Sequence, residues 1–281
     1  MYKGMADIFK AELKRGFSSY RYKTSLAISL IFPIFYIVVD LLPKMDKSVE
    51  AIKDKVAAYS TSTAYREIFT SNFGSGESII FFELLPLLIA LPYAITWRMD
   101  VKSGYINHLL IRCRKSKVLL VKYLVTFITG GAIAVIPQIV GFILVMMILP
   151  LNMPDQVMGH LATGRNLFSE LYFTKPFLFV CLFLLVDFIY AGCLATLCIT
   201  IGSIFDSVAA SFCSAYLYIK CLTVIANFWG RGMIIQPAAV LAMAQGCPTD
   251  NIWILFIPIY PVLLAGIVNY LWARKNDLSV R

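Results

Sequence analysis

Long apolar stretches, separated by charged segments or by segments with Gly and Pro, dominate the chain. Six of them have roughly the length of a membrane-spanning helix, which needs about 20 mostly apolar residues. They cover residues 24–43, 79–97, 117–149, 176–201, 207–228 and 251–272. The pattern predicts an all-α integral membrane protein, one domain over residues 1–281 with six transmembrane helices. Six crossings leave both termini on the same side.

The third stretch is too long for a simple crossing. It has 33 residues, and as a helix it would run about 50 Å against a hydrocarbon core of about 30 Å. We expect it to tilt, to project beyond the bilayer, or to bend at Gly130, Gly131 or Pro137. Pro86 and Pro92 in the second stretch also lack a backbone donor, and such prolines either form a hinge or pack within the helix.

Residues 2–20 precede the first stretch and have an amphipathic helical pattern. One half of the helical wheel is apolar and the other half is charged, which predicts a helix lying in the membrane interface. The apolar half holds Met5, Ile8, Phe9, Leu13, Phe17 and Tyr20, with Glu12 and Arg15 at its edge, and the charged half holds Lys3, Asp7, Lys10 and Lys14. An ordinary polar lead-in is the alternative.

The apolar segment 232–245 lies between the fifth and sixth stretches. It has only 14 residues and contains Pro237, so it is too short to cross the bilayer and return. We interpret it as a short re-entrant or interfacial element on the outer side. Irregular backbone at that depth requires burial within protein.

The composition also excludes several classes of protein. The chain is 59% apolar and 15% charged, with a mean hydropathy of +0.77, whereas soluble domains carry about 25% charged residues. Its seven cysteines contain no CxxC pair and indicate small core hydrophobes. His108 and His160 fall on opposite predicted faces of the membrane and cannot share a metal ion. We therefore expect no metal, no cofactor and no catalytic residue on this chain.

Lysine and arginine residues are unevenly distributed between the two sides. Sixteen lie on the side of the termini and of the 98–117 connection, while eight lie on the other side, where eight acidic residues balance them. The positive-inside rule then places both termini in the cytoplasm. The net charge of +9 is thus an orientation signal, and we expect no nucleic-acid partner.

Three charged residues, Glu83, Asp187 and Lys220, lie within the apolar stretches. A charged group there costs about 2.5 kcal/mol or more on insertion scales, so these side chains should not face lipid. They could form a proton relay or a polar transport path. The alternative is a structural pair, with Asp187 and Lys220 as the candidate partners.

The basic connection at 98–117 has the pattern of a docking element. Asp100 and Ser103 can supply oxygens to free N–H groups at a helix start, and cations suit the helix end. The short helix presents Tyr105, Ile106, Leu109 and Leu110 on one side, with Arg112 and Lys115 beyond them. A small apolar patch ringed by cations is typical of a surface that binds a partner. An ordinary solvated loop is the alternative.

This region resembles the permease subunits of ABC transporters of the type-2, exporter-like class. The matching features are Asp100, Ser103 and Gly104, the pair Leu109 and Leu110, the turn Lys115-Ser116-Lys117, and Lys122. The chain departs from the commonest form of the motif in having Asp at position 100 and Arg112-Cys113-Arg114 where a proline often stands. The similarity extends to the interfacial helix, the six crossings and the re-entrant element.

The resemblance implies a half-transporter in the bacterial cell membrane. Two permeases, as a homodimer or a heterodimer, would line a path, and each 98–117 loop would dock a separate ATPase subunit that binds ATP and Mg. The aromatic-rich spans suggest an amphipathic substrate such as a peptide antibiotic, a drug or a lipid-linked compound. Two alternatives are a proton-coupled secondary carrier that uses the intramembrane charges, and a non-transporting sensor or immunity protein whose 44–78 loop binds a ligand.

Overall fold

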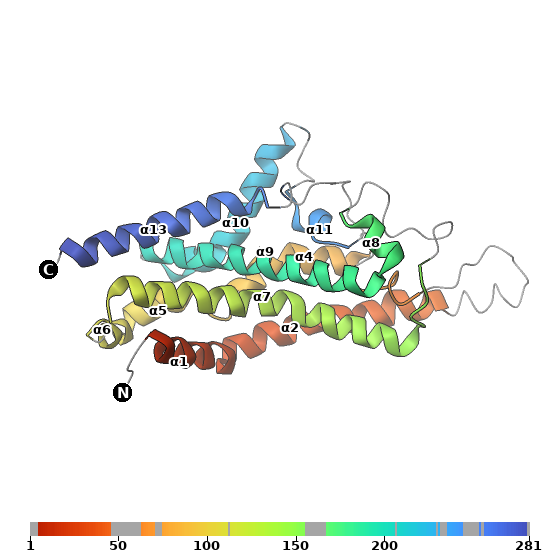
Figure 1. The fold of residues 1–281 in the computed structure, drawn as a ribbon, viewed down its shortest axis with the longest axis horizontal. Helices are drawn as coiled ribbons and strands as arrows, with labels where there is room; N and C mark the ends of the chain where they lie inside the picture. The colour runs from red at the N-terminus through yellow and green to blue at the C-terminus, as the bar shows by residue number, and fades with distance from the viewer. Residues whose placement is uncertain are drawn as a thin grey trace, which may run out of the picture.

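The chain folds into a bundle of long helices in a computed structural model (Figure 1). The structure describes residues 5–45, 63–70, 75–111, 113–154, 167–205, 207–228, 230, 235–243, 253 and 256–279, with only the backbone at 276–279. Within these residues every regular element is a helix. The predicted all-α class is therefore confirmed.

Among the residues that the structure describes, four helices are long and apolar enough to cross a membrane, which indicates an integral membrane protein. The first runs over Tyr20–Met45 and contains α2 (Tyr20–Tyr36) and the π-helical turn η1 (Ile37–Leu41); the others are α7 (Lys115–Ile148), α9 (Pro176–Ile204) and α10 (Val208–Asn227). They coincide with the first, third, fourth and fifth predicted spans. Helix length and composition do not show the second and sixth predicted spans.

The second predicted span is not one helix over 79–97. Instead, α4 (Gly76–Ala90) is followed by turns at 91–95 and by α5 (Thr96–Lys102). Pro92 has no N–H to donate to the carbonyl of Leu88, four residues earlier, so regular helical bonding cannot continue. The Leu88 carbonyl instead accepts a hydrogen bond of 2.7 Å from Ser25 Oγ on α2. This bond joins the first two predicted spans where the second is interrupted.

The last long helix, α13 (Ile259–Ser279), begins later than the predicted 251–272. Asn269 Nδ2 ties it to two other helices, donating to Tyr123 Oη of α7 at 2.9 Å and to Ser203 Oγ of α9 at 2.7 Å. The shorter helices are α1 (Met5–Ser18), α6 (Tyr105–Leu110), α8 (Ser169–Thr174) and α11 (Pro237–Val240). Helices α1, α5 and α6 lie at the same end of the bundle as the end of α13 (Figure 1).

Helix α7 is unbroken over its 34 residues, including the predicted bend positions Gly130, Gly131 and Pro137. The two glycines lie instead where α7 packs against α9. A methyl group on Gly130 would lie 2.6 Å from Cβ of Ala195, and one on Gly131 would lie 2.7 Å from the Phe188 ring. Their position is explained by close helix packing. Pro86 likewise lies inside α4 without ending it.

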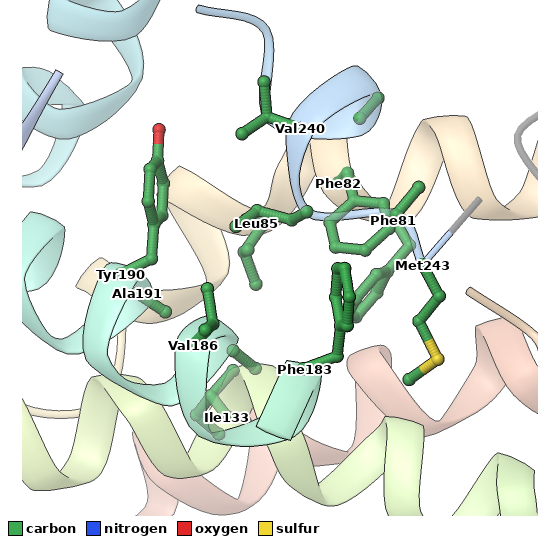
Figure 2. Close-up of a cluster of buried hydrophobic side chains, with 14 of the residues drawn as sticks. Phe81, Phe82, Leu85, Ile133, Phe183, Val186, Tyr190, Ala191, Val240 and Met243 are labelled. Carbon is green, nitrogen blue, oxygen red and sulfur yellow. The ribbon is translucent and has the colours of Figure 1, made fainter. Parts of the chain in front are cut away.

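The segment 235–243, which includes α11, folds back into the bundle. Residues 237–243 are buried, and Val240 and Met243 lie near Phe81 and Phe82 of α4 and Phe183 of α9 (Figure 2). The Met243 N–H donates to the Thr70 carbonyl at 3.1 Å. The sequence predicted that an element containing Pro237 must be buried within protein, and residues 237–243 are buried. Residues 232–234 and 244–245 of the predicted element lie outside the described residues.

Candidate functional site

A buried cluster of charged and tyrosine side chains joins α1 to the α4–α7 region. Its members come from α1, from the turns after α4, and from α5, α6 and α7. They are Glu12, Arg15, Tyr93, Asp100, Tyr105 and Lys122, and are called the charge cluster below. Two carboxylates and two cations make it electrically balanced, as burial of charge requires.

Lys122 lies at the centre of the charge cluster and is 1% exposed. Its ammonium group donates to Asp100, to Tyr93 Oη at 3.1 Å and to Glu12 Oε2 at 3.4 Å. Tyr93 also donates to Glu12. The first turns of α7 are thereby linked to α1 and α5 through one lysine. No sequence motif predicted Glu12 or Tyr93 as its partners.

Arg15 closes the charge cluster on its solvent side. Its guanidinium group binds both carboxylate oxygens of Asp100, at 2.5 and 2.9 Å, and stacks 4.6 Å from the ring centre of Tyr105. The hydrogen bonds to Asp100 raise the pKa of Arg15 against the opposing effect of burial. Tyr105 Oη donates to Glu12 Oε1 at 3.2 Å. Helices α1, α5 and α6 are thus held together by charge-assisted bonds.

The charge cluster changes the interpretation of residues 2–20. The buried residues of α1 are Ile8, Glu12 and Gly16, spaced four apart, rather than the whole predicted apolar half. A methyl group on Gly16 would lie 3.1 Å from Thr129 of α7. Because Glu12 lies by Lys122 and Gly16 by Thr129, α1 advances along α7. The apparent defect in the apolar pattern at Glu12 was the signal that this residue has a buried partner.

The side chains of Asp100 and Ser103 do not cap the start of the loop helix as the sequence predicted. Asp100 does not cap a helix, because its carboxylate is bound by Arg15 and Lys122, and Ser103 Oγ donates to the Asp100 carbonyl at 3.4 Å. Gly104 makes the turn between α5 and α6 with a φ of 75°. L-residues with a side chain rarely adopt this left-handed conformation. Gly104 therefore has a backbone role in orienting α6.

The apolar face of α6 packs inward. Ile106 and Leu109 are 6% and 5% exposed and lie in a cluster with Trp97, Val118, Leu119, Ile199 and Ala273. The expectation that these two side chains face a partner is therefore wrong for this structure. The exposed residues around α6 are Asn107, His108, Leu110 and Ile111, and Ile111 is 83% exposed. Arg112 lies outside the described residues, and Lys115 Nζ lies 5.7 Å from the Trp272 ring centre.

Replacing Gly104 with alanine is expected to lower stability by about 1–2 kcal/mol, the usual cost of a left-handed conformation for a residue with Cβ. Apart from the adjoining residues, no atom of the described part of the chain lies within 4 Å of the added methyl group, so backbone strain is the expected cause. Gly104→Asn should cost less, since asparagine tolerates this conformation better. Thermal unfolding in detergent measures both. An equal loss in the two variants would contradict a backbone cause.

The intramembrane charges pair differently from the prediction. Lys220 of α10 forms its ion pair with Glu83 of α4, and Gln236 Nε2 donates to the same carboxylate at 2.6 Å. The predicted Asp187–Lys220 pair is wrong. The Glu83–Lys220 pair instead connects α4 and α10 to the segment that contains α11. Its side chains are 22% and 39% exposed.

Asp187 of α9 is buried against neutral groups. Gln138 Nε2 of α7 donates to Asp187 Oδ2 at 2.7 Å, and Thr70 Oγ1 lies 3.4 Å from Gln138 Oε1. Asp187 Oδ1 has no hydrogen-bond partner in the described part of the chain. Asp187 is therefore separate from both the charge cluster and the Glu83–Lys220 pair.

The described residues contain no group of three or more His, Cys, Asp or Glu side chains that could hold a metal ion. His160 lies outside them, as do 46–62 and 71–74 of the predicted ligand-binding loop. No protein-family model matches the chain, and no curated protein or solved structure matches it. The candidate site therefore rests on the chain's own geometry.

Proposed function

We propose that this chain is the membrane-spanning subunit of an ATP-driven ABC exporter of the type-2 class. Its six crossings would be the segment from α2 to Met45, then α4, α7, α9, α10 and α13. Both termini would lie in the cytoplasm of a bacterial cell, at the end of the bundle that carries α1, α5 and α6. The common position of those helices and the end of α13 supports this arrangement (Figure 1).

The observation that carries the proposal is the charge cluster. It binds the loop helices α5 and α6 to α1 and to the first turns of α7, a long apolar helix. Such a set of contacts suits a loop that transmits force from a cytoplasmic partner to the membrane helices. Transmission also requires that the partner bind the loop differently in its two states.

The partner would be a separate ATPase subunit, which supplies bound ATP and Mg, and hydrolysis would not take place on this chain. Its contact would be the outward surface of α6 and the following turn. That surface combines exposed Leu110 and Ile111 with polar Asn107 and His108. Asp100 and Lys122 would act by holding the loop in place, because both are buried within the chain.

A second permease copy, identical or related, would complete the transport path. Four helices with exposed apolar side chains leave ample surface for lipid and for such a copy. The aromatic-rich spans suit an amphipathic substrate such as a peptide antibiotic, a drug or a lipid-linked compound. Pro86, Pro92 and Pro137 remain candidate hinges for the change between inward and outward access.

Ile111→Glu is expected to abolish association with the ATPase subunit while leaving the unfolding temperature unchanged. The side chain is 83% exposed, so the carboxylate stays hydrated in the free chain but would be buried in a docked complex. The test is to express the chain with candidate ATPase subunits from the same genome and to measure copurification and ATP-dependent transport in vesicles.

Met153→Glu is the matched control, because Met153 is also exposed, at 69%, but follows α7 at its far end. It should leave the complex intact. Leu109→Asp is unsuitable, since Leu109 is buried and the change would disturb folding. If transport persists without any ATPase subunit and is lost in Glu83→Gln, the exporter proposal is wrong.

One observation favours a proton-coupled secondary carrier as the second candidate. Asp187 is fully buried between α7 and α9 with Gln138 as its hydrogen-bond partner, and Glu83 and Lys220 provide further ionisable groups among the apolar helices. Such residues often mark proton pathways. This alternative requires transport that collapses with the proton gradient, whereas the exporter requires transport that depends on ATP.

A further inference from the structure

Helix α1 has three chemically different sides. Ile8, Glu12 and Gly16 are buried against the protein. Phe9, Leu13 and Phe17 form a half-buried apolar flank beside them, which is packed in part against the buried clusters of the protein. Lys10 and Lys14 are exposed on the next part of the helix surface, one turn apart. The two lysines therefore lie away from the side by which α1 is held to the protein.

The two exposed lysines have no anionic partner among the residues that the structure describes. The ion pairs at this end of the bundle use Arg15 and Lys122, which bind Glu12 and Asp100. Side chains one turn apart on a helix have Cβ atoms about 6 Å apart, close enough for both ammonium groups to reach neighbouring anions. Asp7, one turn before Lys10, supplies one nearby negative charge, so the two lysines leave one positive charge for an anion from outside this part of the chain.

The position of α1 identifies the source of that anion. Helix α7 has 34 residues and is therefore about 51 Å long. Even at the largest usual tilt of about 40° it spans about 39 Å against a hydrocarbon core of about 30 Å, so one or both of its ends extend beyond the core. Helix α1 packs along the first half of α7, where Lys122 is also located. With the proposed orientation, this region lies at the level of the cytoplasmic headgroups, where anionic lipids attract basic helices.

We propose that Lys10 and Lys14 form a binding surface for the phosphate groups of anionic phospholipids, which hold α1 against α7. The exposed part of the apolar flank faces the acyl boundary while the lysines bind headgroups. Because Glu12 and Arg15 belong to the same helix, lipid binding would also stabilise the charge cluster. The proposal rests on the membrane orientation given above and does not require an ATPase subunit.

The test uses the purified full chain in nanodiscs of phosphatidylcholine, with and without phosphatidylglycerol. Backbone hydrogen exchange in α1 is expected to slow roughly tenfold with phosphatidylglycerol, given the usual attraction between lysines and an anionic surface. High salt should remove the effect, because it screens exposed charges. Inorganic phosphate added to phosphatidylcholine discs should not reproduce it, since a free ion lacks the membrane's surface potential.

Lys10→Gln/Lys14→Gln should lose the lipid dependence and keep its unfolding temperature in phosphatidylcholine. Lys102→Gln/Lys117→Gln, which changes two exposed lysines of the loop region, should retain the dependence. Equal exchange in both lipids, or loss of the effect in the control variant as well, overturns the proposal. So does protection of α1 that arises with an ATPase subunit but not with phosphatidylglycerol. That last outcome leaves the exporter proposal standing.

Discussion

Lys122→Met is expected to destabilise the protein by about 3–5 kcal/mol, the usual cost of removing one partner from a buried ion pair. The ammonium group of Lys122 is bound by Asp100, Glu12 and Tyr93, and its removal leaves two buried carboxylates with Arg15 as their cation. Methionine fills a similar volume, so lost charge and lost hydrogen bonds dominate the effect. Thermal and denaturant unfolding in detergent measure the loss.

Two further variants separate this effect from a general loss of charge. Lys117→Met changes an exposed lysine near the start of the same helix and should alter stability by less than about 0.5 kcal/mol. Lys122→Met/Asp100→Asn removes one of the two carboxylates that would otherwise share Arg15 as their cation, and it should recover at least about 1 kcal/mol relative to the sum of the single changes. Additive losses, or equal losses at 117 and 122, would contradict the charge cluster.

Gly192→Val is expected to prevent stable folding, at a cost above about 3 kcal/mol, beyond the usual range for overpacking. A Cβ on Gly192 would lie 2.7 Å from the backbone carbonyl oxygen of Phe127 and 2.8 Å from its ring. A ring can rotate, but the carbonyl belongs to the unbroken helix α7 and can move only with it. The yield of monodisperse protein and its unfolding temperature measure the effect.

Gly266→Ala on α13 provides the matched control. Outside the helix's own backbone and the adjoining residues, the described residues place no atom within 4 Å of the added methyl group. Alanine favours a helix over glycine by about 1 kcal/mol, so this variant should be slightly more stable. If Gly192→Val instead folds with an unchanged unfolding temperature, the close contact of α7 and α9 is contradicted. If Gly130 or Gly131 were a hinge, replacing that glycine would abolish transport without lowering the stability of the protein.

Together these two contacts suggest how movement would pass through the chain. The charge cluster joins α1, α5 and α6 to the start of α7, while the glycine contacts join the middle of α7 to the middle of α9. A displacement of α6 would therefore move α7 and α9 together more easily than it would separate them. The interrupted region around Pro92 has less regular backbone hydrogen bonding. It is therefore the more favourable place for a change in the angle between α4 and α5.

The docking region shows where sequence patterns become ambiguous. The pattern Tyr105, Ile106, Leu109 and Leu110 predicts an amphipathic helix, and α6 is one. A stripe of apolar residues indicates that a helix has a face to bury but does not identify what covers it. Here Ile106 and Leu109 are covered by the chain's own Trp97 and Leu119, so the face open to a partner is a different one.

Ionisable residues show the same limitation. The free energy required to place a charged group in an apolar environment predicted that Glu83, Asp187 and Lys220 avoid lipid. The choice of partner depended on which helices lie side by side, and α4 lies beside α10 close enough for Glu83 to reach Lys220. Asp187 faces Gln138 of α7 instead. Opposite charge alone could not distinguish the two acidic residues as partners for the lysine.

The sequence by itself determined the all-helical class, four of the long apolar helices and their order, because hydropathy and helical length are properties of contiguous residues. Tertiary structure alone decided the charge cluster, the inward face of α6, the Glu83–Lys220 pair and the close contact through Gly130, Gly131 and Gly192. Each of these joins residues far apart in the chain. Their energies depend on which helix faces are brought together, and no local pattern encodes that.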